Sequence, residues 1–158
     1  MRGLSFICDN ELFAVDVSLV QKVILNMDFT PVPAPPGVAG LANIKGGIVT
    51  VFCLNELLGR KKSKKAVNAV VFKSFSGGND QIGLLVDQSG DLIEITEDKI
   101  HPPPVSEAES DKFCISGIAE ADGKFYRIIN PEGIIKSFEN LGESANNTNI
   151  TLEGGNND

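Results

Sequence analysis

The sequence predicts an all-β fold in which two small β-barrels of five strands each pack through a shared core. Ten short apolar runs alternate with Gly, Asn, Asp and Pro, and their side chains follow a period of two rather than a helical period. A faint repeat at an offset of 77 residues places 40–58 over 117–135 and divides the strands into two similar halves. Two closed barrels are preferred to one ten-stranded sheet because closure removes exposed strand edges.

The predicted strands are rich in Val, Ile and Phe, which suit a pleated, half-buried surface. Ile82, Leu84 and Val86 show the alternation, since all three fall on one face of their run. The first half supplies strands at 3–8, 11–16, 20–25, 38–44 and 47–54, and the second half supplies strands at 67–74, 80–86, 90–96, 113–119 and 124–129.

Turn signals separate these runs. The pairs Asp9-Asn10, Gly46-Gly47 and Asp122-Gly123 each predict a tight hairpin turn, because these residue types tolerate a positive φ. Two proline-rich stretches, 31–37 and 102–104, predict loops or sheet edges, because proline donates no ladder hydrogen bond.

Helix is expected in only a few short pieces. Residues 55–58 predict a single turn that ends at Gly59, and 17–20 predict a turn of helix that leads into a strand. Residues 131–138 predict a short terminal helix with Asn130 as its N-cap and proline at its first position.

The chain divides into barrel halves at approximately 1–60 and 66–138, with an exchange of terminal strands between them left open. Residues 139–158 hold six Asn, four acidic residues and no Lys or Arg, and this composition predicts a disordered acidic tail. The 158-residue chain has a formal charge of −7, from 14 basic and 21 acidic residues. Without the tail the charge is 14 − 17 = −3, so over half of it belongs to the tail.

Composition excludes several kinds of partner. An acidic balance disfavours nucleic acid and anionic membranes, which both need clustered basic residues. No apolar run approaches the length of a membrane span, and the apolar run near the first residue is too short for a signal peptide, so we expect a cytoplasmic protein. A basic run at 60–65 is interpreted as a solvated connector, and acidic residues gather between 87 and 111. Opposite charge patches of this kind suit a protein partner.

No catalytic residue, metal or cofactor is expected. Cys8, Cys53 and Cys114 are interpreted as buried reduced thiols, and His101, the only histidine, stands beside a proline run. An alternative is a zinc protein that uses these four residues, although their spacing lacks the close Cys pair usual at zinc sites. A small-ligand binder is a third possibility, but barrels of five strands have little interior space.

Two segments carry a resemblance to a known family. Residues 20–54 contain VQKVI followed by TPVPAPPGVAGLANIKGGIVTVFCL, and residues 82–95 read IGLLVDQSGDLIEI. The order of these motifs resembles the CheW family of bacterial chemotaxis coupling proteins, whose central pattern is approximately V-x-E-I, P-x-P, G-x-x-N-x-R-G-x-x-x-P-V-x-D-L. The resemblance extends over about 3–138, so we expect a CheW-like module at 1–138.

The resemblance implies a fold of two five-stranded, SH3-like β-barrels and a non-enzymatic adaptor. Its partners would be the cytoplasmic tip of a methyl-accepting chemoreceptor and the regulatory domain of a CheA-type histidine kinase. Receptor helices would dock in an apolar groove between the barrels. Such a protein would be a monomer alone and would join receptor arrays at the inner membrane through its partners, without inserting into the membrane.

The positions that match the family pattern are expected to form the partner-binding site: Val20, Lys22, Val23, Gly40, Asn43, Lys45, Gly46 and Asp87. Val20 and Val23 would offer apolar contacts near the groove, and both glycines would permit tight backbone. Asn43 would bond the turn that displays Lys45 as a charged contact. Asp87 follows a buried run and would cap the next turn.

The chain departs from the family pattern at four positions, two of which belong to this expected site. Lys45 stands for Arg, which keeps the charge without the bidentate geometry, and Lys22 stands for Glu, which reverses the charge. Thr50 and Cys53 replace the Pro and the Asp. These departures leave open a second interpretation, a diverged scaffold of another two-component pathway whose partner carries matching charges.

Overall fold

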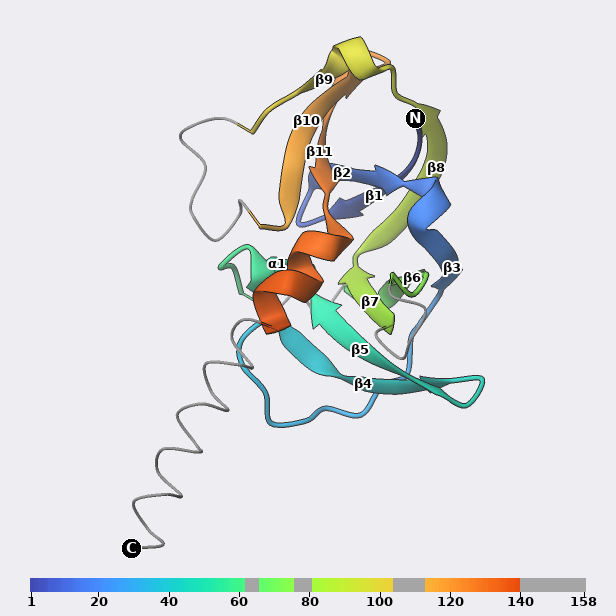
Figure 1. Cartoon of the computed structure of the whole chain (residues 1–158), viewed down its shortest axis with the longest axis vertical. Coiled ribbons are helices and arrows are strands. Elements are labelled where there is room, and N and C mark those ends of the chain that lie inside the picture. Colours follow the sequence, from blue (N-terminus) through green and yellow to red (C-terminus); the bar gives the residue numbers. More distant parts are fainter. Residues whose placement is uncertain (62–65, 76–80, 104–112, 140–158) are drawn as a thin grey trace, which may run out of the picture.

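Two β-sheets account for most of the molecule (Figure 1). The computed structural model describes residues 1–61, 66–75, 81–103 and 113–139. One sheet has six strands and the other has five, and they pack over one apolar core. The expected all-β class, with two packed sheets and few short helices, is confirmed.

The six-stranded sheet is built from both ends of the chain, in the order β8-β1-β2-β11-β10-β9. Its strands are β1 (Arg2–Cys8), β2 (Glu11–Asp16), β8 (Gln88–Glu94), β9 (Ile100–His101), β10 (Ile115–Ala121) and β11 (Lys124–Ile129). All neighbours are antiparallel except β2 and β11, which are parallel. The β1–β2 turn has Asp9 at φ 53° and Asn10 at φ 64°, as the Asp-Asn pair predicts.

The five-stranded sheet comes from the middle of the chain, in the order β3-β6-β7-β5-β4. Its strands are β3 (Val20–Ile24), β4 (Val38–Ile44), β5 (Gly47–Cys53), β6 (Asn68–Phe72) and β7 (Gln81–Val86). Here β5 and β7 form the parallel pair. The buried strands β6 and β7 are almost wholly apolar, as strands covered on both faces must be.

The two sheets do not coincide with the sequence halves 1–60 and 66–138. The β1–β2 hairpin lies in the sheet of the last strands, whereas β6 and β7 lie in the sheet of the middle strands. Each sheet is therefore completed by strands from the other half of the chain. Within the described ranges no ladder joins the outer strands of either sheet to each other.

The internal repeat corresponds to two matching hairpins. The β4–β5 hairpin turns at Lys45 (φ 51°) and Gly46 (φ 83°), and the β10–β11 hairpin turns at Asp122 (φ 52°) and Gly123 (φ 73°). Both pairs have the two positive φ values of a type I′ turn, which matches the twist of the flanking strands. The β4–β5 turn is therefore at 45–46 rather than at the predicted Gly46-Gly47 pair.

Gly40 and Gly117 match across the repeat because each lets a third segment approach its strand. A Cβ on Gly40 would lie 2.2 Å from the carbonyl oxygen of Thr30, and one on Gly117 would lie 2.8 Å from that of His101. Thr30 forms a β-bridge with Leu41. In the same way His101 of β9 pairs with Ile118 of β10, the residue that matches Leu41 in the repeat. Gly40 therefore serves the packing of the fold.

The helical pieces cover strand ends. Two short 3-10 helices, η1 (Val17–Leu19) and η2 (Glu97–Lys99), lead into β3 and β9. Helix α1 (Leu54–Leu57) follows β5. Residues 131–139 form a further helix after β11, and the Oδ1 atom of Asn130 accepts a hydrogen bond from the Gly133 amide at 3.1 Å, as expected of an N-cap.

The shared core lies between the sheets. Its largest fully buried side chains include Phe6 and Phe13 from one sheet and Phe52 and Phe72 from the other. The helix 131–139 closes one side of this core, since Phe138 meets Phe52 edge to face at a centroid distance of 5.3 Å. A smaller cluster fills the far side of each sheet.

Some predicted segments lie outside the described residues. These are most of the connector after Lys61 and the acidic tail from 140 onward. The tail was expected to start at 139, but Glu139 is the last residue of the helix in the described part.

Candidate protein-interaction site

The tip of the β4–β5 hairpin displays Lys45. The Oδ1 atom of Asn43 accepts a hydrogen bond from the Gly46 amide at 3.0 Å, which braces the turn as the sequence predicts. Lys45 is exposed and occupies the first position of the turn. Its positive φ is a backbone conformation that few residues other than Gly adopt. The turn therefore fixes the backbone at Lys45 and presents its charged side chain beyond the end of the sheet.

Replacing Asn43 with Ala is expected to lower the free energy of unfolding by about 1 kcal/mol, because the hydrogen bond to the Gly46 amide is lost. Hydrogen exchange of that amide should speed up in the variant while the amides of the matching β10–β11 turn keep their rates. Unaltered exchange at Gly46 would show that the turn does not depend on Asn43.

An apolar recess opens beside this hairpin, between the face of β5 and β7 and the helix 131–139. Its cavity volume is about 160 Å³, and it is lined by Thr50, Phe52, Gln81, Ile82, Ile135, Phe138 and Glu139. Leu41 pairs with Thr50, and Asn43 pairs with Ile48, so all four share the face that lines the recess. Ile48 is 55% exposed and Leu41 is 37% exposed.

This continuous surface is named the hairpin groove and consists of the cavity-lining residues together with Leu41, Asn43 and Ile48. The opposite face of the same hairpin is buried, because Ala42 and Val49 pack in the second apolar cluster. Leu41 and Ile48 are therefore candidate contact residues beside the recess. The groove was not predicted residue by residue, because its walls come from β5, β7 and the helix 131–139.

Strand β3 lies at the opposite edge of the sheet from the hairpin and reaches the groove through one side-chain contact. The side-chain amide of Gln81 donates hydrogen bonds to the Gln21 side chain and to the Phe72 carbonyl. Val20 and Val23 are half-buried and pack against the shared core, and Lys22 is half-buried on the same strand. The predicted residues of β3 and of the β4–β5 hairpin thus belong to one sheet but to its two outer strands.

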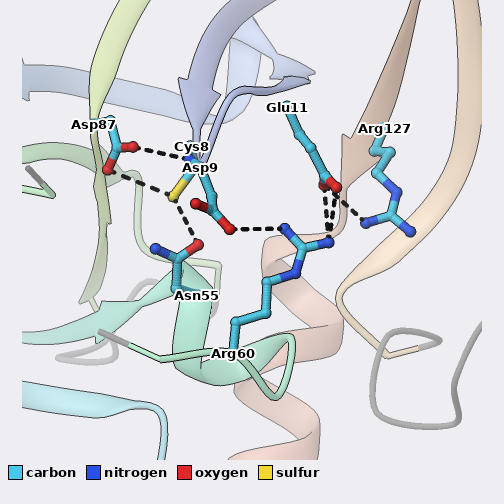
Figure 2. A network of polar contacts seen from close by, with 7 residues as sticks. All are labelled: Cys8, Asp9, Glu11, Asn55, Arg60, Asp87 and Arg127. Carbon is cyan, nitrogen blue, oxygen red and sulfur yellow. Dashed lines mark hydrogen bonds and ion pairs between the residues drawn. The ribbon is translucent and has the colours of Figure 1, made fainter. Parts of the chain in front are cut away.

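Asp87 lies apart from the groove and holds the β1–β2 turn (Figure 2). Its Oδ2 atom accepts a hydrogen bond from the Asp9 amide at 2.8 Å, and its Oδ1 atom lies 3.9 Å from the Cys8 sulfur. The carboxylate was expected to cap the turn that follows it, but it caps a turn 78 residues away in the sequence instead. This contact gives Asp87 a structural role.

Figure 2 also shows an ion-pair network that the sequence does not predict. The Arg60 guanidinium contacts the Glu11 carboxylate at 2.9 Å and the Asp9 carboxylate at 3.9 Å, and Arg127 approaches Glu11 at 3.4 Å. Arg60 belongs to the basic run interpreted as a solvated connector, yet its side chain is only 28% exposed. The network joins the segment that follows α1 to strands β2 and β11 of the six-stranded sheet.

The thiols do not form the zinc site considered as an alternative. Burial raises the pKa of the Cys8 thiol to about 12, with the charge of Asp87 as the second cause, and its sulfur donates to the Asn55 side chain at 3.3 Å. Cys53 and Cys114 are buried, whereas His101 is exposed on β9. Among the described residues no three His, Cys, Asp or Glu side chains are grouped so as to hold a metal.

These features define a binding module. The recess offers contact area to a partner, and the adjoining hairpin presents an exposed lysine at its tip. None of the described helices is long and apolar enough to span a bilayer.

Comparisons with known proteins place this module in a family. A model of the CheW-like domain matches residues 2–139, so the chain belongs to the CheW-like domain family. It is 28% identical over 134 residues to the chemotaxis protein CheW of Thermotoga maritima, covering 84% of this chain and 86% of the relative. It is 23% identical over 137 residues to CheW of Rhizobium meliloti, covering 86% and 88%.

A solved structure supports the same fold. The scaffolding protein TtCheW from Thermoanaerobacter tengcongensis superposes with a TM-score of 0.72 at 28% identity, covering 82% of this chain and 88% of that one. The resemblance predicted from the sequence motifs is therefore confirmed.

Proposed function

We propose that the protein is a cytoplasmic, non-enzymatic adaptor that couples chemoreceptor tips to a CheA-type histidine kinase in bacterial chemotaxis. The observation that carries this proposal is the family match over residues 2–139, which takes in both sheets and the terminal helix. The relatives named chemotaxis protein CheW and the solved CheW scaffold support it.

The hairpin groove is the proposed contact for the helices of a receptor tip. An amphipathic helix buries its apolar face in such a recess, and Ile48 and Leu41 extend the apolar wall beyond the cavity. Lys45 would meet an acidic side chain at the edge of that contact. Val20, Lys22 and Val23 on β3 would form the flank of the same surface, whereas Gly40, Gly46 and Asp87 act through the fold.

Co-sedimentation with receptor-tip fragments and the kinase tests the proposal. The folded chain is expected to sediment with an assembly of the two and to bind each separately. A folded chain that binds neither the receptor fragment nor the kinase would contradict the proposed function.

Replacing Lys45 with Glu is expected to weaken receptor-fragment binding about tenfold, because a cation at the edge of the contact becomes an anion. The fold should be unaffected, since the side chain is exposed. Lys124→Glu, an exposed lysine beside the matching β10–β11 turn, is the control and should bind as the parent does. Equal affinities of Lys45→Glu and the parent would remove Lys45 from the site. Isothermal titration calorimetry measures the affinity of each variant for the receptor fragment.

A diverged scaffold in another two-component pathway is the second candidate. The departures from the family pattern favour it, because Lys45 and Thr50 belong to the hairpin and Lys22 lies on β3, the outer strand at the opposite edge of the same sheet. Cys53, in contrast, is buried at the start of α1. Receptor fragments with acidic side chains at the facing positions should then bind more tightly than fragments with the usual charges.

A further inference from the structure

We propose that the segment 140–158 of the same chain docks in the hairpin groove and competes there with an outside partner. The competition depends on the proposed function, whereas the docking does not. Three features of the chain support it: where the terminal helix ends, how far the chain extends beyond that point, and the chemistry of the two surfaces.

The terminal helix delivers the chain to the rim of the groove. Ile135, Phe138 and Glu139 line the cavity, and Glu139 is the last described residue of the helix. Nineteen residues follow it in the sequence. The segment that follows residue 139 therefore starts at the groove, and no linker is needed to bring it there.

The reach of these residues exceeds the length of the groove. From Thr50 at the cavity to Lys45 at the hairpin tip the strand rises about 17 Å at about 3.3 Å per residue. Eleven residues beyond Glu139, at Ile150, an extended chain covers up to about 36 Å. The apolar residues of the segment can therefore reach Ile48 and Leu41 with chain to spare.

The two surfaces are chemically complementary. The segment contains the apolar residues Leu141, Ala145, Ile150 and Leu152, three acidic residues and no Lys or Arg. The strands of the five-stranded sheet contain no Asp or Glu, and Lys45 is exposed at the hairpin turn. Lys22 lies on β3 at the opposite edge of the sheet, and Glu139 is the one acidic residue that lines the cavity. Apolar contacts over Leu41 and Ile48 would thus form close to the positive charge of Lys45.

Attachment makes even a weak contact significant. A tethered segment meets its site at an effective concentration of roughly millimolar, so a contact that would be too weak between separate molecules is populated in cis. If the docked form is as populated as the open form or several times more, a partner loses about twofold to tenfold in apparent affinity.

Nuclear magnetic resonance of the full ¹⁵N-labelled chain tests the docking. The double variant Ile150→Asp with Leu152→Asp removes two apolar contacts and adds two charges. The control, Asn146→Asp with Asn149→Asp, adds the same two charges at polar positions. The first variant should shift the amide resonances of Thr50, Gln81 and Ile82, and the control should leave them near their parent positions.

Two results would overturn the docking: unchanged groove resonances in the first variant, or shifts that depend on protein concentration, which would assign the groove to a second copy. Binding of a receptor-tip fragment provides the separate readout for competition. The first variant should bind it about twofold to tenfold more tightly than the control does. If no variant binds the fragment although the resonances shift, the proposed function fails while the docking stands.

Discussion

Replacing Phe13 with Ala is expected to lower the free energy of unfolding by about 3–5 kcal/mol, because it leaves a cavity in the shared core. The Phe13 ring is fully buried and stacks on Phe6 of the neighbouring strand at a centroid distance of 5.7 Å. Both rings lie in the cluster to which the two sheets contribute, so the sheets have little freedom to close the space. For a chain of this length the melting temperature should fall by roughly 10 °C.

Phe125→Ala is the matched control for this measurement. It removes the same side chain from β11, where the ring is 64% exposed, and should change the free energy of unfolding by no more than about 0.5 kcal/mol. Urea unfolding of both variants gives the comparison. Similar losses for Phe13 and Phe125 would mean that the two sheets do not share a tightly packed core.

Replacing Ile48 with Asp is expected to weaken binding of a receptor-tip fragment about 30-fold, which corresponds to about 2 kcal/mol. Ile48 is the most exposed aliphatic side chain of the hairpin groove, and a partner that buries this residue would have to bury the new carboxylate as well. The β-sheet should persist, because more than half of the Ile48 side chain is exposed and its replacement removes few packing contacts.

Leu92→Asp tests whether the loss is specific to the groove. Leu92 is also 55% exposed but lies on β8 of the other sheet, so the same type of substitution should leave the affinity for the receptor fragment unchanged. Equal losses in the two variants would indicate a general effect of added charge. No loss in Ile48→Asp would exclude the hairpin from the contact.

Local structure was largely predictable from the sequence. Strands bounded by clear turn signals, such as 11–16, 38–44 and 124–129, were placed at their observed bounds. Strand β8 begins two residues before its predicted start, because it is an exposed edge strand whose polar first residues carry no alternation. Strand β9 was missed because two residues are too few to form a pattern.

Contacts between distant segments were not predictable in the same way. The parallel pairing of β2 with β11 and of β5 with β7 exchanges strands between the halves, and no local pattern specifies a partner across such distances. For the same reason Asp87 was assigned to the wrong turn and Arg60 to a solvated connector. The Asn43–Gly46 contact was found because both residues lie within one turn.

The most direct test of the central claim, that the hairpin groove receives the partner, is chemical-shift mapping of the ¹⁵N-labelled full chain during titration with a receptor-tip fragment. The largest changes should fall on Ile48, Thr50, Gln81 and Ile82, which lie in the groove on β5 and β7. Changes confined to the six-stranded sheet, with the groove resonances unmoved at saturation, would contradict the claim.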